Sequence, residues 1–144
     1  MSVNQVSVFL ENKPGTLNKL TEVLASHNIN IRALSLAETS EFGIVRMLVN
    51  DVFEATNILK ENNFVASLTP VLAMEISDET GGLDQLLTYF DEASVNIEYM
   101  YAFSGGSSTK HAYMIFRVSD TNAAEAKLAG KGIKMLTQED LAQI

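Results

Sequence analysis

Residues 10–17 read LENKPGTL, and along this segment one pattern of apolar residues gives way to another. Before it, apolar and polar residues alternate along residues 6–10, which predicts a half-buried strand. After it, apolar residues recur at helical spacing along residues 17–24, which predicts an amphipathic helix. Pro14 and Gly15 interrupt the strand between the two. The segment therefore predicts a tight corner at which a strand turns into a helix, and the following Thr16 is expected to cap that helix.

The same corner recurs 66 residues further along the chain, where residues 76–83 read ISDETGGL. Beyond this point the step between matching residues grows to 69, so that Val49 matches Val118 and Asp51 matches Asp120. An ordered series of matches of this kind indicates an internal duplication.

The duplication predicts a first module at residues 1–70 and a second at residues 71–144. A three-residue insertion explains the longer step, and we expect it in the Gly/Ser-rich residues 104–108, because the length of such a loop changes at low cost. In the first module we expect strands at residues 6–10, 30–38, 44–49 and 64–69, and helices at residues 17–24 and 55–62. In the second we expect strands at residues 71–76, 96–103, 112–118 and 133–136, and helices at residues 83–93, 121–129 and 138–143.

This order of elements predicts an α+β fold of two ferredoxin-like βαββαβ modules, each an antiparallel sheet with both helices on one face. Placed side by side, the two modules would form an eight-stranded sheet. Residues 44–49 read IVRMLV and are apolar on both strand faces apart from Arg46, a pattern typical of strands covered on both sides. Because the helices cover one face only, we expect the other face to pack against a second chain or the other copy, and a homodimer is favoured.

The composition excludes several classes of function. The chain has a net charge of −8, and its ten Lys and Arg residues are scattered, so a basic face for nucleic acid is missing. No run of eighteen apolar residues predicts a membrane span, and the first residues do not resemble a secretory signal. With zero cysteines, disulfides and thiolate zinc sites are excluded, which fits a cytoplasmic protein.

Motifs for catalysis or cofactor binding are not found in the sequence. His27 and His111 lack a metal-binding partner at ligand spacing, so we expect no metal. The sequence contains neither a nucleotide-binding glycine motif nor a nucleophile elbow, so we expect no cofactor and no catalytic residue. Some small enzymes share the predicted topology, so the fold alone does not decide between binding and catalysis.

The predicted corner suits a zwitterion. The start of a helix leaves backbone N–H groups without partners and carries partial positive charge, which favours a carboxylate. Gly15 allows a ligand to approach the main chain closely. Asn12 and Asn30 offer side-chain carbonyls to an ammonium group, and we expect both to face one small concavity.

The pattern Asn12-x-Pro14-Gly15-x-Leu17, followed by the pair Asn30-Ile31, resembles the ACT domain, the regulatory module of amino-acid metabolism. The resemblance implies that an amino acid binds at this loop, commonly at an interface between two modules. It places ligand contacts of the first copy at Asn12, Gly15, Leu17, Asn30 and Ile31. We expect the other residues of the loop, Lys13, Pro14 and Thr16, to complete this site.

The second copy matches the pattern less well. Asp78 stands where the first copy has Asn12, and Thr80-Gly81 replaces Pro14-Gly15. The aspartate could pair with an ammonium group, so this site is either altered or lost. Its expected residues are Asp78, Gly81, Gly82, Leu83, Asn96 and Ile97.

Three functions follow, in order of preference. The first is a regulatory protein that binds a free amino acid and passes the signal to a regulated enzyme or another protein. The second is a structural or protein-interaction module, because a Pro-Gly pair before a helix is also an ordinary tight turn. The third is a small enzyme with its substrate at the same loop.

Overall fold

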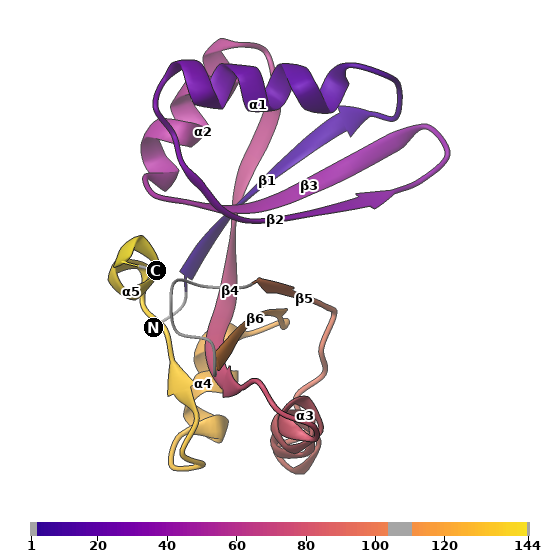
Figure 1. Cartoon of the computed structure of the whole chain (residues 1–144). Coiled ribbons are helices and arrows are strands. Elements are labelled where there is room, and N and C mark those ends of the chain that lie inside the picture. Colours follow the sequence, from indigo (N-terminus) through magenta and orange to yellow (C-terminus); the bar gives the residue numbers. More distant parts are fainter. Residues whose placement is uncertain (1–2, 104–110, 144) are drawn as a thin grey trace. The chain divides into compact units, whose positions relative to one another are not determined.

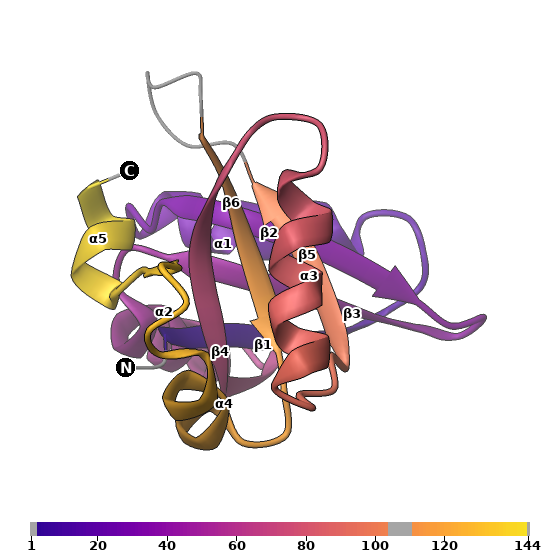
Figure 2. The same ribbon diagram turned by 90° about the horizontal axis from the view of Figure 1, so that it is seen from below.

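A computed structural model describes residues 3–103 and 111–143 of the chain. The chain divides into two compact units, whose elements are drawn in Figures 1 and 2. The N-terminal unit comprises residues 4–69, and the C-terminal unit comprises Val3 and the described residues from Pro70 onward. The insertion expected at residues 104–108 lies outside the described residues.

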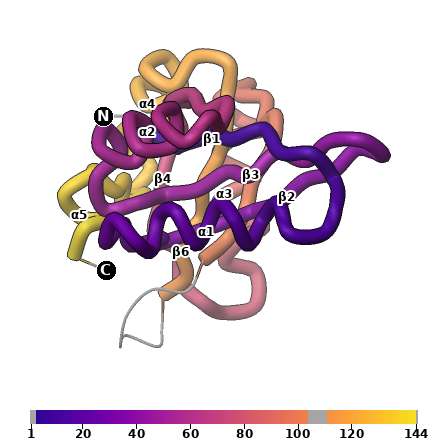
Figure 3. Tube along the Cα trace, turned by 90° about the horizontal axis from the view of Figure 1, so that it is seen from above, coloured from indigo at the N-terminus to yellow at the C-terminus, as the bar shows by residue number. Residues whose placement is uncertain are grey.

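The N-terminal unit has the predicted βαββαβ order. Its elements are β1 (Val3–Glu11), α1 (Thr16–Ser26), β2 (Ile31–Glu38), β3 (Phe42–Val49), α2 (Val52–Glu61) and the first part of β4 (Val65–Ser77). Val45 of β3 pairs antiparallel with Val8 of β1 on one side and with Leu36 of β2 on the other. The strand order is β2-β3-β1-β4, and Figure 3 shows α1 and α2 over the same face of these strands. This arrangement confirms the ferredoxin-like module.

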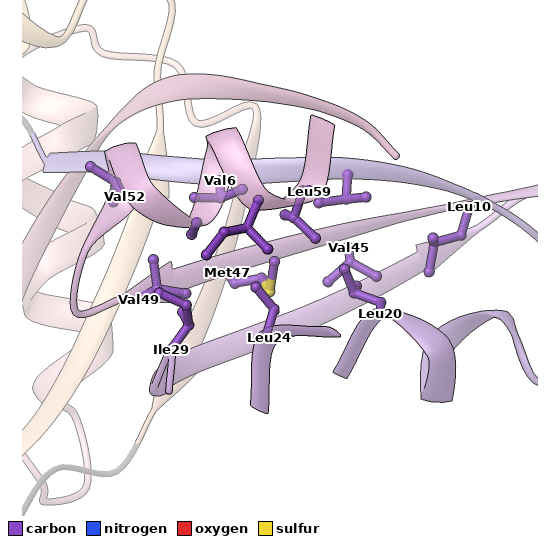
Figure 4. Close-up of a cluster of buried hydrophobic side chains, with 13 residues drawn as sticks. Val6, Leu10, Leu20, Leu24, Ile29, Val45, Met47, Val49, Val52 and Leu59 are labelled. Atoms are coloured by element: carbon purple, nitrogen blue, oxygen red, sulfur yellow. The ribbon is translucent and has the colours of Figure 1, made fainter. Parts of the chain in front are cut away.

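The core of the N-terminal unit lies between its sheet and its two helices (Figure 4). Alternate residues of β1 and β3 face the helices, as the period of a strand requires. Leu20 and Leu24 of α1 lie one turn apart on the buried face of that helix. Removing each such side chain from water contributes about 1.5–3 kcal/mol. The buried strand residues of this core are Val6, Val8, Leu10, Val45, Met47 and Val49.

The C-terminal unit repeats the arrangement. After the second part of β4 come α3 (Gly82–Glu92), β5 (Tyr99–Phe103), β6 (His111–Arg117), α4 (Thr121–Leu128), β7 (Lys134–Met135) and α5 (Gln138–Gln143). Strand β6 pairs antiparallel with β4 and β5, and β7 pairs with β4. Residues of α3 and α4 share one core with β4 and β6, in which the rings of Phe90 and Phe116 lie 4.7 Å apart.

The described residues hold seven strands, where the sequence predicted eight. The last strand of the first copy and the first strand of the second are continuous, and together they form β4. Pro70 lies within this strand, and its fixed φ is compatible with extended backbone. All eight predicted strand segments are therefore present, and they count as seven strands because two of them adjoin without a turn.

The duplication is visible in the backbone. Asp51 and Asp120 cap α2 and α4, and each carboxylate accepts a 3.0 Å hydrogen bond from the backbone N–H three residues later. Three left-handed positions also recur at the steps found in the sequence: Gly15 (φ 89°) and Gly81 (φ 90°), Asn28 (φ 59°) and Ser94 (φ 55°), and Asn63 (φ 66°) and Gly132 (φ 76°).

Candidate functional site

The corner between β1 and α1 turns through a left-handed glycine. Gly15 is the N-cap of α1 with φ 89°, a conformation that glycine adopts without strain. The prediction that Thr16 caps the helix was wrong, because Thr16 is its first residue. The Thr16 hydroxyl instead donates to the carbonyl oxygens of Glu11 at 2.8 Å and Lys13 at 3.0 Å. It thereby ties the start of the helix to the end of the strand.

No side chain caps α1, because glycine occupies the cap position. The first N–H groups of a helix point outward and carry partial positive charge. Within the described residues, the start of α1 is therefore open to an anionic group from outside the chain.

A hollow of about 650 Å³ lies beside this corner. Its volume falls within the range of small-molecule sites, about 300–1,000 Å³. The corner residues Lys13, Pro14, Gly15 and Thr16 line it. The hollow is therefore large enough for a free amino acid.

Charged groups of both signs line the hollow. The Lys13 ammonium lies 2.8 Å from the Glu11 carboxylate, and both side chains are exposed. The hydrogen bond from Lys13 lowers the pKa of Glu11 below its ordinary value of 4.5. Lys19 lies one turn along α1, also lines the hollow and forms no ion pair with any described residue.

Apolar side chains line another part of the same hollow. They are Phe9 of β1, Phe42 at the start of β3, Val65 at the start of β4 and Phe64 directly before it. Phe9 is 55% exposed, Phe42 is 52% exposed and Val65 is 66% exposed. Large apolar side chains gathered on a surface and exposed to this extent mark a binding site more often than chance.

The structure separates the two asparagines that were predicted to face one concavity. The Asn12 side-chain amide donates to the Thr39 carbonyl at 3.0 Å, and the Asn12 backbone N–H donates to the Glu41 carbonyl at 2.9 Å. Asn30 lies at the other end of the sheet, where its backbone N–H donates to the Asn50 side chain at 3.0 Å.

The reason is strand direction. Because β1 and β2 both run antiparallel to β3, they point the same way, and α1 carries the chain back to the start of β1. The shared concavity was therefore a wrong prediction within one module. Leu17 and Ile31 pack against the hydrophobic core.

The corner between β4 and α3 has the same backbone geometry and a smaller hollow. Gly81 caps α3 with φ 90°, and the adjoining hollow has a volume of about 360 Å³. Gly81 and Gly82 line this hollow, whereas Asp78 and Leu83 are not among its lining residues.

Asn96 and Ile97 lie away from the second corner for the same reason as in the first module. β5 begins beside the end of β6, where Tyr99 pairs with Arg117, whereas β4 ends beside the start of β6. Ile97 packs against the core of the C-terminal unit.

The sequence matches the family described as the ACT domain pair over residues 1–144. The chain belongs to this family.

This ACT domain pair is similar to a crystal structure of a protein from Bacteroides thetaiotaomicron, with 37% sequence identity and a TM-score of 0.92 over 100% of this chain and 98% of that one. It also resembles the ligand-free regulatory subunit of aspartate kinase from Thermus thermophilus, at 18% identity and a TM-score of 0.64, with 87% of each chain covered. The regulatory subunit from Thermus flavus is 15% identical, with a TM-score of 0.58 over 87% of this chain and 89% of that one. At these identities the two subunits show a shared fold. No curated protein matches the sequence.

The family match supports a ligand-binding regulatory role for the ACT domain pair. None of its described helices is both long and apolar enough to cross a membrane.

Sequence reasoning found the corner of the ACT domain pair and missed the apolar part of its hollow. One signal was available: Phe9 lies between Val8 and Leu10, so an aromatic side chain occupies a strand position that faces away from the core. Phe42 and Val65 carry no such signal in the sequence, because they reach the hollow only through the pairing of their strands.

Proposed function

We propose that this ACT domain pair is a regulatory protein that binds a free amino acid at the β1–α1 corner of its N-terminal unit. The observation that carries the proposal is the hollow of about 650 Å³ beside a helix start that no side chain caps. Such a helix start attracts a carboxylate, and the ammonium groups of Lys13 and Lys19 add to the attraction. The Glu11 carboxylate is the acceptor for the α-ammonium group of the ligand.

Ligand binding at this corner reaches other segments of the unit through Asn12. This residue follows Glu11 directly and holds the turn between β2 and β3 through its bonds to Thr39 and Glu41. A ligand that fixes the corner therefore also fixes this turn. We expect the bound form to be the one that a regulated enzyme or another partner protein recognises.

The predicted ligand contacts of Asn30 and Ile31 require a second module. Asn30 and Ile31 lie at the far end of the sheet from Gly15, so one module cannot bring them to its own corner. We therefore propose that they contact a ligand held by a second copy of the chain, in a homodimer. The outer strand β2 supports this arrangement, because it exposes the side chains of Leu34 and Leu36.

A charge reversal in the hollow tests the proposed function. Lys19→Glu places a carboxylate beside the α-carboxylate of the ligand, and we expect affinity for the best-bound amino acid to fall about tenfold or more. Isothermal titration calorimetry of the full chain with each of the twenty amino acids measures the affinity.

Lys60→Glu is the matched control, because it makes the same change of charge away from the hollow. Lys60 lies in the last turn of α2 and is not among the residues that line the hollow. It should leave the affinity unchanged. The proposal fails if none of the twenty amino acids binds to the unaltered chain, a result that favours a protein-interaction module. If the two substitutions lower the affinity equally, the ligand does not bind at the β1–α1 corner.

A further inference from the structure

The residues that correspond to the apolar part of the first hollow are different in the C-terminal unit, and of these residues Glu75 lines the second hollow. The duplication matches Phe9 with Glu75, Phe42 with His111 and Val65 with Lys134, at the steps of 66 and 69 residues. Strand pairing supports the match, because Phe42 pairs with Glu11 in the first unit and His111 pairs with Ser77 in the second. Three exposed apolar side chains in one unit therefore correspond to three ionisable ones in the other.

In the C-terminal unit these three side chains form a polar cluster centred on Glu75. Lys134 Nζ lies 2.9 Å from one Glu75 oxygen, and His111 Nδ1 lies 3.3 Å from the other. The Glu75 side chain is only 13% exposed. An apolar ligand group placed against this cluster would remove water from paired charges and offer no hydrogen bond in return, which is unfavourable.

The corner charges differ as well. The duplication matches Lys13 with Glu79 and Lys19 with Gln85, so the second corner has a carboxylate where the first has an ammonium group. The cation that lines the second hollow, Lys131, lies 3.6 Å from the Glu92 carboxylate. The α-carboxylate of an amino acid is thus attracted at the first corner and repelled at the second.

From these differences we infer that the ligand is an amino acid with an apolar side chain, aromatic or branched aliphatic, and that each chain binds one molecule, at the N-terminal corner. The inference rests on the proposed function and adds the class of ligand and the number of sites. The zwitterion lies against Glu11, Lys13 and the start of α1, and the apolar side chain contacts Phe9, Phe42 and Val65. The C-terminal corner keeps the backbone turn without binding the same ligand.

Calorimetric titration of the full chain tests both parts. The probes are phenylalanine, leucine, alanine, serine, aspartate and lysine, each added to the same protein preparation. We expect phenylalanine or leucine to bind at least tenfold more tightly than the polar and charged amino acids, with one molecule per chain. Tighter binding of serine, aspartate or lysine, or two equal sites per chain, would overturn the inference and leave the proposed function standing. If none of the six probes binds, the inference fails, and titration with the remaining fourteen amino acids then decides whether the proposed function fails with it.

A pair of equivalent substitutions locates the apolar contact. Phe42→Ser removes one ring from the first hollow, and we expect affinity for phenylalanine or leucine to fall about tenfold while that for alanine changes little. His111→Ser, the matched change in the second unit, should alter neither affinity nor stoichiometry. Because both side chains are exposed, both variants should fold, and circular dichroism checks this. A loss of affinity in His111→Ser, or equal losses for alanine and phenylalanine in Phe42→Ser, would contradict the inference.

Discussion

Single residues set the geometry of the two corners, and glycine acts there in two different ways. Gly15 and Gly81 supply left-handed N-caps, and a side chain at either position would meet nothing within 4 Å. Gly82 is needed for space, because a Cβ there would overlap the Ser77 carbonyl oxygen. In the first corner Thr16 occupies the equivalent position and bonds to Glu11 through its hydroxyl. The second corner is therefore the tighter of the two.

Alanine substitutions at Gly15 and Gly82 distinguish the strain of a left-handed backbone from the lack of space for a side chain. Gly15→Ala places a side chain in the left-handed region, which costs about 1–2 kcal/mol of the free energy of unfolding. Gly82→Ala forces the start of α3 away from Ser77, and we expect a larger loss because the obstacle is backbone and cannot rotate aside. Urea unfolding of both variants gives the comparison. A smaller loss for Gly82→Ala than for Gly15→Ala would show that α3 begins farther from Ser77.

Most helices and strands could be predicted because their signals are local. The alternation of Val6, Val8 and Leu10 and the helical spacing after Leu17 depend on neighbouring residues only, and the duplication supplied each signal twice. The position of Asn30 relative to Asn12 is not local, since it depends on how β2 pairs with β3. The cap of α1 was misassigned because threonine is a common N-cap, and only the left-handed backbone of Gly15 shows otherwise.

The start of the short helix α5 is held by a pair of hydrogen bonds, one of which depends on the ionisation of Asp140. The Thr137 N–H donates to the Asp140 carboxylate at 2.8 Å, and the Asp140 N–H donates to the Thr137 hydroxyl at 3.1 Å. This reciprocal pair is a capping box. The hydrogen bond from the Thr137 backbone lowers the pKa of Asp140 below its ordinary value of 3.8.

We predict that α5 frays when Asp140 is protonated. Because the pKa of Asp140 is lowered in the folded state, its contribution to stability is present above pH 3.8 and is lost as the pH falls through the lowered value. Amide exchange of Leu141, followed by NMR from pH 6 downward, measures the fraying. Asp140→Asn should remove most of this pH dependence, and Glu139→Gln, beside the capping pair, should keep it. An exchange profile that is the same in Asp140→Asn as in the unaltered chain would contradict this account.

At the scale of the whole molecule, the site was predictable only in part. Lys13, Pro14, Gly15 and Thr16 are contiguous, so the sequence alone could group them, and the structure places all four beside one hollow. The apolar part of the hollow joins β1, β3 and β4, so its composition depends on the packed sheet. The cluster of Glu75, His111 and Lys134, of which Glu75 lines the second hollow, likewise becomes visible only in the packed sheet.

The proposed homodimer makes a prediction about mass. The chain has a mass of 15.8 kDa, and light scattering behind size-exclusion chromatography should give twice this value. Leu36→Lys places a charge on the exposed outer strand β2, and we expect it to yield monomers, because burying an unpaired charge in the dimer is unfavourable.

Phe53→Lys is the control, since Phe53 is an exposed apolar residue of α2 and not of β2. It should remain a dimer. A monomeric unaltered chain would refute the homodimer, and dimers of Leu36→Lys would exclude β2 as the interface.

The most direct test of amino-acid binding at the N-terminal corner is an NMR titration of the ¹⁵N-labelled full chain, with the twenty amino acids added one at a time. Gly15 and Gly81 occupy the same backbone position in the two units, so their amide signals serve as reporters for the two corners. We expect at least one amino acid to shift the amide signals of Gly15, Thr16 and Lys19 and to leave that of Gly81 in place. Spectra in which Gly15 does not respond to any of the twenty, or in which Gly81 responds instead, would contradict it.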